Sequence, residues 1–300
     1  MDRLVPKTLS ARWGQRAPPE LKVFFMNKTI GVIGLGIIGG AWARNYAADG
    51  VLAGCWNRTP QPQMPAWKNT PEEVVKAADV VQIVVADPPA VAGILEKILP
   101  WLGPGKIVVQ SSTIDPASSE KFSAQVTARG ARYLEAPFTG SKPAAENRQT
   151  VFFLGGFAGL VAEVEPLLSR ISAHRFHLGT GAQAASVKLA LNLNILAQME
   201  GLAEALTIAR RAGVGDEMFF RVLEKNIAYS GLVKLKEPKL RTNDFSPQFS
   251  VKHMHKDMRL ATAMVGANAM PLLEALRERL RQVEERGGAD EDFSALIKLL

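Results

Sequence analysis

The feature that most restricts the fold of this 300-residue chain is the glycine-rich run GLGIIGG at residues 34–40. Gly34, Gly36 and Gly39 have the G-x-G-x-x-G spacing, and Gly34 is the last residue of TIGVIG, an apolar stretch that indicates a strand. Between a strand and a helix, such glycines permit a tight turn, close approach of the backbone to a pyrophosphate, and close helix–strand packing. The pattern therefore predicts a dinucleotide site. Its expected contacts here are Gly34, Leu35, Gly36, Ile37, Ile38 and Gly39.

Apolar segments alternate with helical ones over residues 28–181. Continuous apolar strands are covered on both faces, which implies parallel pairing with helical crossovers. This region is therefore predicted to form an α/β, doubly wound, Rossmann-type N-terminal domain with a mostly parallel sheet. We expect its strands in residues 29–34, 51–57, 80–86, 106–112, 131–137 and 150–156.

The pattern changes after Gly181, where the strand signals end. Residues 183–211 are apolar on nearly every face, which predicts a buried helix roughly 40 Å long. The rest of the chain indicates further helices, so residues 182–300 are predicted to form an all-α C-terminal domain whose first helix connects domains or subunits. Because such an apolar surface is rarely left in water, a homodimer or homotetramer is expected.

Charge and composition exclude several classes of protein. The net charge is +7, but residues 1–28 hold six basic and two acidic side chains and the other bases are scattered, so no nucleic-acid binding is expected. No apolar stretch is long enough to span a bilayer, and we expect no membrane association. The single cysteine, Cys55, favours a reducing compartment such as the cytoplasm. Residues 1–27 are expected to be a disordered extension; a transit peptide and a misassigned start are the alternatives.

The second expected strand ends in NRTP, at the place where a carboxylate would bind the ribose hydroxyls of NAD. This chain instead has Asn57, Arg58 and Thr59. The guanidinium of Arg58 offers a planar fork to a phosphate, and the neighbouring side chains add hydrogen-bonding groups. The segment therefore favours NADP (NADPH) as the cofactor, with NAD as the alternative.

Six segments, in order, resemble the β-hydroxyacid dehydrogenase family from about Lys28 to the C-terminus. They are GLGIIG, WNRT, SSTIDP, EAPFTGSKPAAE, KHMHKDMRLA and DEDFSALI. The resemblance is closest to the glyoxylate/succinic semialdehyde reductase branch. It implies an NADP-dependent oxidoreductase that interconverts a small aldehyde acid and its hydroxy acid. An NAD-dependent enzyme of the 3-hydroxyisobutyrate or tartronate semialdehyde type is the alternative.

The resemblance also implies which residues act. In SVKLALN, Lys188 and Asn192 match the family's catalytic lysine and asparagine. A protonated lysine can donate to the oxygen that gains negative charge as hydride reaches an aldehyde carbon, and an amide on the same helix face can hold it in register. Thr139 and the backbone of Gly140 and Ser141 are expected to cradle the substrate carboxylate. The remaining expected cofactor contacts are Ala86, Asp87, Thr113 and Lys256.

The chain also departs from the family pattern. Ala182 and Ala184 replace glycines that commonly precede the lysine, and the Pro-rich PQPQMPAWKN is shorter than the usual segment, so its crossover helix is expected to be lost or reduced. His253 and His255 diverge on a helix, and we expect no metal site. Two other functions stay open: an imine-reducing relative, which the retained Lys188 disfavours, and a catalytically silent cofactor-binding module.

Overall fold

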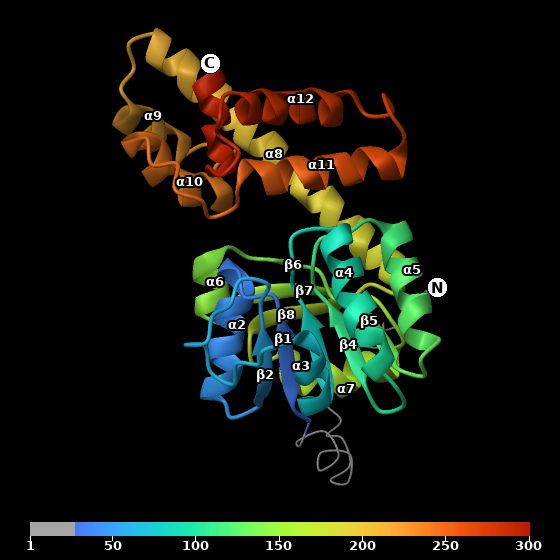
Figure 1. The fold of residues 1–300 in the computed structure, drawn as a ribbon. Coiled ribbons are helices and arrows are strands. Elements are labelled where there is room, and N and C mark those ends of the chain that lie inside the picture. The colour runs from blue at the N-terminus through green and yellow to red at the C-terminus, as the bar shows by residue number, and fades with distance from the viewer. Residues whose placement is uncertain (1–27) are drawn as a thin grey trace, which may run out of the picture.

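The structure is a computed structural model that describes residues 28–300, so the expectations for residues 1–27 lie outside the described residues. Figure 1 shows an α/β part, built from the first half of the chain, beneath a helical part built from the second half. The α/β part holds a five-stranded parallel sheet in the order β2-β1-β3-β4-β5. Its strands are β1 (Ile30–Ile33), β2 (Leu52–Trp56), β3 (Val80–Ile83), β4 (Ile107–Gln110) and β5 (Arg132–Glu135).

Helices cross over between successive strands of this sheet, which confirms the predicted fold class. Every residue of β1, β3 and β4 is buried, as expected for strands that helices cover on both faces. The chain runs from β1 outward to β2 and returns to β3 on the other side of β1, so a crevice opens at the carboxyl ends of β1 and β3. The crossover helices are α2 (Ile37–Ala48), α3 (Pro71–Ala77), α4 (Pro88–Ile98) and α5 (Pro116–Thr127).

A second sheet, of three strands in the order β6-β7-β8, receives the last strand expected from the sequence. That strand is β7 (Thr150–Leu154), which pairs antiparallel with β6 (Phe138–Thr139) and parallel with β8 (Ser172–His177). The two sheets join where Glu135 and Gly155 exchange backbone hydrogen bonds. The sequence did not predict β6, which has only two residues, or β8, whose polar SAHRFH lacks an apolar run. Two further helices connect its strands: α6 (Lys142–Glu146) lies between β6 and β7, and α7 (Ala158–Leu168) lies between β7 and β8.

The long helix α8 (Gly181–Arg211) runs from the α/β part into the helical part (Figure 1). It begins at Gly181 rather than Gln183 because Thr180 and Gln183 form a capping box: each side chain accepts a hydrogen bond from the other's backbone N–H. Buried leucines of α8, such as Leu189, Leu196 and Leu206, lie in the core of the helical part. The other helices there are α9 (Asp216–Leu223), α10 (Gly231–Thr242), α11 (Val251–Val265), α12 (Pro271–Glu285) and the 3-10 helix η2 (Phe293–Leu299).

The segment between β2 and α3 lacks the additional helix that the sequence resemblance implies. Residues 57–70 form turns, and the first helix after β2 is α3. The segment instead pairs with the edge of the sheet, because Cys55 N donates to Ala66 O at 3.0 Å and Lys68 N donates to Cys55 O at 2.9 Å. This outcome confirms the expected loss of that helix. Within residues 28–300, no helix has both the length and the apolar character needed to cross a membrane.

Candidate active site

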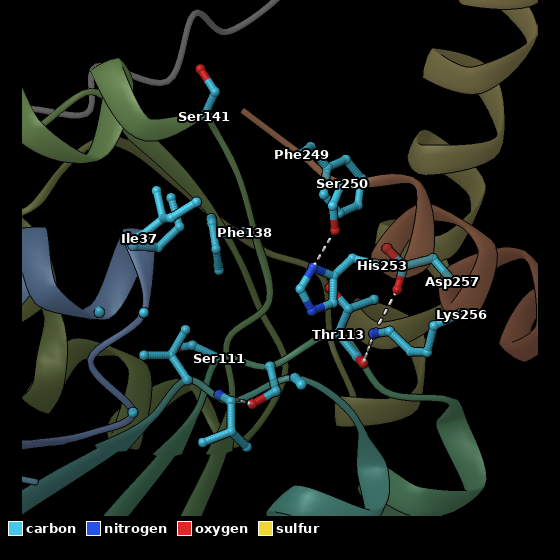
Figure 2. A pocket seen from close by; sticks show the side chains of 18 of the residues that line it. Ile37, Ser111, Thr113, Phe138, Ser141, Phe249, Ser250, His253, Lys256 and Asp257 are labelled. Carbon is cyan, nitrogen blue, oxygen red and sulfur yellow. Dashed lines mark hydrogen bonds and ion pairs between the residues drawn. The ribbon is translucent and has the colours of Figure 1, made fainter. Parts of the chain in front are cut away.

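A cavity of about 1130 Å³ lies where the α/β part meets the helical part. Its walls come from the glycine turn, the loops after β3 and β4, the segment 138–141, and helices α8, α10 and α11. Figure 2 shows Ile37 and Phe138 on one side and Phe249, Ser250 and His253 on the other. Pockets for single small ligands hold about 300–1,000 Å³. This cavity is slightly larger than that range, as the predicted combination of a dinucleotide and a small substrate requires.

The glycine turn fits a pyrophosphate. Gly34 has a φ of +101°, and a Cβ there would lie 2.1 Å from the carbonyl oxygen of Val84. A Cβ on Gly39 would lie 1.9 Å from the carbonyl oxygen of Gly34, so both positions require glycine. Gly36 lines the cavity and has nothing within 4 Å of where its Cβ would be. Because α2 begins there without a side-chain cap, its first N–H groups are available to an anion.

The end of β2 is tied to the glycine turn by Asn57. Its Oδ1 accepts a hydrogen bond from Leu35 N at 3.1 Å, and its Nδ2 donates to Thr59 O at 3.0 Å. Arg58, which follows, is exposed and lines the cavity. Lys97, from the last turn of α4, also lines it, with its ammonium 5.7 Å from the ring of Trp56. The sequence gives no functional signal for Lys97, because a lysine at the end of a helix usually only complements the helix dipole.

The loop after β4 is held from two sides. Ser112 N donates to Gln110 Oε1 at 2.6 Å, while Ser112 Oγ accepts from Val85 N at 2.8 Å. The carbonyl of Thr113 accepts a hydrogen bond from Lys256 Nζ at 2.7 Å, visible in Figure 2. Lys256 therefore joins α11 to this loop across the cavity. Ser111, Ser112 and Thr113 all line the cavity.

Lys188 and Asn192 lie on the face of α8 that lines this cavity. Lys188 Nζ donates to Asn192 Oδ1 at 2.9 Å, and Asn192 Nδ2 donates to Asp257 Oδ2 at 2.5 Å. The side chain of Lys256 pairs with the other oxygen of Asp257 at 2.6 Å. Lys188 is only 8% exposed and Asn192 only 1%. Lys188, Asn192, Asp257 and Lys256 thus form a continuous series of polar contacts from α8 to α11.

Burial lowers the pKa of Lys188 from its ordinary value to about 8. The Asp257 carboxylate opposes this shift, and the charge of Lys256 adds to it. A lysine with a pKa near 8 holds a proton at neutral pH and releases it more readily than an exposed lysine. It therefore has the properties of a general acid and base near neutral pH. Asp257 was not singled out from the sequence, although it directly follows Lys256 in KHMHKDM.

The segment after β5 brings the expected carboxylate cradle to the same cavity. Thr139, Gly140 and Ser141 all line it, and Gly140 has a φ of +129°, which favours glycine. Phe138, one residue earlier, lies beside the lysine, with its ring centroid 5.8 Å from Lys188 Nζ. Thr139 supplies a hydroxyl, and the other two residues supply backbone N–H groups. The structure thus brings Lys188 and three residues that could bind an anion into one cavity.

Not every predicted contact faces the cavity. Leu35, Thr59 and Asp87 do not line it. Leu35 is buried, and Asp87 caps α4 by accepting a hydrogen bond from Ala90 N at 2.8 Å. These three residues lie in loops in which the adjacent residues line the cavity. The predicted residues that do line it are Gly34, Gly36, Ile37, Ile38, Gly39, Asn57, Arg58, Ala86, Thr113, Thr139, Gly140, Ser141, Lys188, Asn192 and Lys256.

The two histidines of α11 face different surroundings. His253 lines the cavity and pairs through Nδ1 with Ser250 Oγ at 2.8 Å (Figure 2), whereas His255 pairs with Glu284 of α12 at 2.8 Å. Burial lowers the pKa of His253, and the charges of Lys256 and Lys252 add to this shift. Among residues 28–300, no cluster of three or more His, Cys, Asp or Glu side chains is arranged to hold a metal ion.

Two family models cover almost all of the described chain. The NAD-binding domain of 6-phosphogluconate dehydrogenase matches residues 29–179. The model described as NAD-binding of NADP-dependent 3-hydroxyisobutyrate dehydrogenase matches residues 182–300. The first corresponds to the α/β part with the glycine turn, and the second begins within the first turn of α8.

Individual proteins agree with these matches. The chain is 31% identical to the chloroplastic glyoxylate/succinic semialdehyde reductase 2 of Arabidopsis thaliana, over 95% of this chain and 83% of that protein. It is 30% identical to glyoxylate/succinic semialdehyde reductase 1 of the same plant, over 90% and 97%. A solved structure of Mycobacterium tuberculosis 3-hydroxyisobutyrate dehydrogenase with L-serine superposes with a TM-score of 0.82 at 25% identity, over 91% and 99%. The chain therefore belongs to the β-hydroxyacid dehydrogenase family and is an NAD(P)-dependent oxidoreductase that acts on CH–OH groups.

Proposed function

We propose that this enzyme uses NADP to interconvert a small aldehyde acid, such as glyoxylate or succinic semialdehyde, and its hydroxy acid, with Lys188 as the general acid and base. The observation that carries the proposal is the buried Lys188–Asn192 pair, which lines the same cavity as the glycine turn and the segment 138–141. The two plant reductases with about 30% identity support the choice of substrate class.

The residues of the cavity have separable roles in this proposal. The bound nicotinamide supplies the hydride for reduction of the aldehyde, or receives it in the reverse direction. Lys188 donates a proton to the oxygen that gains charge as the hydride arrives, and it removes that proton in the reverse reaction. Asn192 holds the ammonium through its Oδ1 and leaves the other N–H groups of Lys188 for the substrate. Thr139 and the N–H groups of Gly140 and Ser141 bind the substrate carboxylate.

We further propose that residues 28–181 bind the cofactor, that residues 182–300 complete the substrate site, and that the enzyme is a cytoplasmic homo-oligomer. Large apolar side chains are exposed on the helical part, including Ile208, Met218 and Val222. Such surface is commonly covered by another subunit. Light scattering coupled to size-exclusion chromatography tests this last proposal, since a mass near 32.5 kDa, that of one chain, would contradict it.

A steady-state screen of short aldehyde acids with NADPH and with NADH tests the proposed reaction. We expect turnover of glyoxylate or succinic semialdehyde with NADPH. Turnover limited to NADH with 3-hydroxyisobutyrate or tartronate semialdehyde type substrates would favour the alternative enzyme, and reduction of imines alone would contradict the proposal.

The NADP preference rests on Arg58 and is tested separately. Arg58→Asp places a carboxylate where a 2′-phosphate would be bound, and the resulting repulsion should lower kcat/KM for NADPH by about tenfold or more, since 1.4 kcal/mol corresponds to tenfold. The value for NADH should fall less or rise. Lys76→Asp, at an exposed lysine of α3 that does not line the cavity, is the control. An unchanged NADPH/NADH ratio in the Arg58 variant would remove the phosphate assignment.

A further inference from the structure

Glu135 is a fully buried carboxylate at the end of β5, just before the segment 138–141. It does not line the cavity. Its side-chain hydrogen-bond partners within the described chain are all neutral: Gln110, Ser119 and Tyr133. Burying a carboxylate without a cation is unfavourable. The position of this group therefore calls for a reason beyond packing.

The two oxygens of Glu135 have different partners. Oε2 accepts hydrogen bonds from Ser119 Oγ and Tyr133 Oη, both at 2.7 Å. Oε1 accepts one from Gln110 Nε2 at 2.9 Å. A hydroxyl group can rotate and act as donor or acceptor. The contacts to Oε2 therefore hold the carboxyl group in place but do not fix the hydrogen-bonding orientation of Ser119 or Tyr133. The contact to Oε1 does favour one orientation of the Gln110 amide, because that amide has a donor end and an acceptor end.

With its donor end turned to Glu135, the amide of Gln110 presents its acceptor end to the next loop. Gln110 Oε1 accepts from Ser112 N at 2.6 Å, and Gln110 Nε2 also donates to Ser112 O at 2.9 Å. The reversed amide would set Oε1 against an acceptor oxygen of Glu135 and Nε2 against the N–H of Ser112. Both contacts would be repulsive in a buried setting. Glu135 therefore stabilises the orientation of Gln110 that also satisfies the N–H and C=O of Ser112.

The loop that Gln110 holds is the one that lines the cavity after β4. Ser111, Ser112 and Thr113 all face the cavity, and the carbonyl of Thr113 accepts the hydrogen bond from Lys256. Figure 2 shows Thr113 below Lys256, opposite the side formed by Ile37 and Phe138. A shift of Ser112 would therefore displace Thr113 and weaken the link to α11.

We propose that Glu135 is a positioning residue for cofactor binding: it acts through Gln110 to fix the 111–113 loop against the nicotinamide end of the dinucleotide. The proposal rests on the proposed function, because the carbonyl of Thr113 is linked through Lys256, Asp257 and Asn192 to Lys188, next to which the nicotinamide would react. Glu135 touches neither substrate nor cofactor, and its effect passes through a single amide.

Glu135 can accept the hydrogen bond from Gln110 whether or not its carboxyl group is ionised. Burial raises the pKa of Glu135 to about 7, and the hydrogen bonds from Tyr133, Ser119 and Gln110 oppose that rise. A proton added to Oε2 can be donated to a hydroxyl oxygen, which leaves Oε1 as the acceptor for Gln110. A neutral acceptor of the same shape should therefore replace the carboxylate. This makes glutamine the conservative variant and leucine the disruptive one.

The test measures binding of NADPH to the full-length protein by the change in nicotinamide fluorescence. Glu135→Leu, which removes the acceptor, should raise the Kd for NADPH by about tenfold, equivalent to about 1.4 kcal/mol of binding free energy, and change the emission of the bound nicotinamide. Glu135→Gln should bind like the wild type. 2′-Phospho-ADP-ribose, which lacks the nicotinamide, should bind all three proteins equally when its Kd is measured by calorimetry.

Two further variants separate positioning from folding. Ser119→Ala removes a donor to the other carboxylate oxygen and should leave NADPH binding unchanged. Gln110→Met breaks the link while Glu135 keeps its hydroxyl partners, so it should reproduce the defect of Glu135→Leu, and the double variant should be no worse than either single one. If Glu135→Leu does not fold, Glu135→Met replaces it in the comparison with Glu135→Gln, because Gln110→Met also removes the direct contacts to Ser112. Wild-type NADPH binding by Gln110→Met, equal loss in Glu135→Gln and Glu135→Leu, or equal loss of 2′-phospho-ADP-ribose binding would overturn the proposal. None of these measurements uses an aldehyde, so failure of the substrate screen would not affect them.

Discussion

Two buried lysines line the same cavity, Lys188 on α8 and Lys236 on α10, but their partners differ. Lys188 donates to the neutral side-chain oxygen of Asn192. Asn192 in turn donates to the carboxylate of Asp257, so Lys188 reaches a carboxylate only through the amide. Lys236 is paired directly with Asp292, with Nζ 2.7 Å from Oδ1. Burial lowers the pKa of both lysines. The difference is that Lys188 can release its proton without breaking an ion pair, whereas Lys236 would leave Asp292 as an unpaired buried charge.

Asp292 also explains why Lys236 is needed in the fold. Its carboxylate accepts backbone hydrogen bonds from Gln248 at 3.0 Å and Phe249 at 3.2 Å, in the segment that leads into α11. That segment lines the cavity, so the ion pair holds one of its walls. We therefore propose a chemical role for Lys188 and a structural role for Lys236. Three experiments test this contrast.

The largest expected effect is that of Lys188→Ala on turnover. Removing a positioned general acid typically costs about 10²–10⁴ in rate, so kcat should fall by this amount while the Kd for NADPH stays within a few-fold of wild type. Lys188→Arg keeps the charge but not a proton that can leave near neutral pH, and it should be similarly impaired. Steady-state kinetics and NADPH titration measure both quantities. Wild-type turnover in either variant would remove Lys188 from the proton transfer.

Substitution of Lys236 should lower the free energy of unfolding. Lys236→Met leaves Asp292 buried and unpaired, and breaking a buried pair in this way costs about 3–5 kcal/mol. Urea denaturation should show this loss, and the double variant Lys236→Met/Asp292→Leu should recover part of it. If Lys236→Met were as stable as the wild type, the ion pair between Lys236 and Asp292 would not stabilise the segment that leads into α11.

The smallest expected effect is a pH dependence that belongs to Lys188 alone. The pKa of Lys188 is lowered to about 8, so its acid form predominates below pH 8 and its base form above. For aldehyde reduction, kcat/KM should therefore fall as pH rises through about 8, by about tenfold per pH unit beyond it. For oxidation of the hydroxy acid it should fall as pH drops below about 8. The Lys188→Arg variant should lack both inflections. An inflection that persists there would assign the titration to another group.

Much of the site could be predicted because its residues carry local signals. The glycine turn has a fixed spacing, and Lys188 and Asn192 stand one helical turn apart in an apolar run. Each of these patterns spans only a few residues, and the fold brings them to one cavity. The strands of the main sheet were predictable for a similar reason, since burial on both faces requires continuous apolar runs.

The parts that could not be predicted depend on contacts between residues distant in sequence. Asp257 acts on Asn192 across 65 positions, and Gln110 meets Glu135 across 25. Nothing beside these residues in the chain indicates such partners. β7 was recognised as a strand, but its place in the second sheet depends on β6 and on β8, whose polar side chains gave no strand signal.

Helix α8 has a consequence for how this enzyme can vary. Its first turns contact the α/β part, while its later turns lie in the core of the helical part, and Lys188 is near the junction. Deleting one residue after Lys188 would rotate the rest of the helix by about 100° relative to the lysine, since one turn takes about 3.6 residues. Asn192 and the buried leucines would then face the wrong neighbours. Insertions and deletions should therefore be tolerated in the surface loops long before they are tolerated between residues 188 and 206.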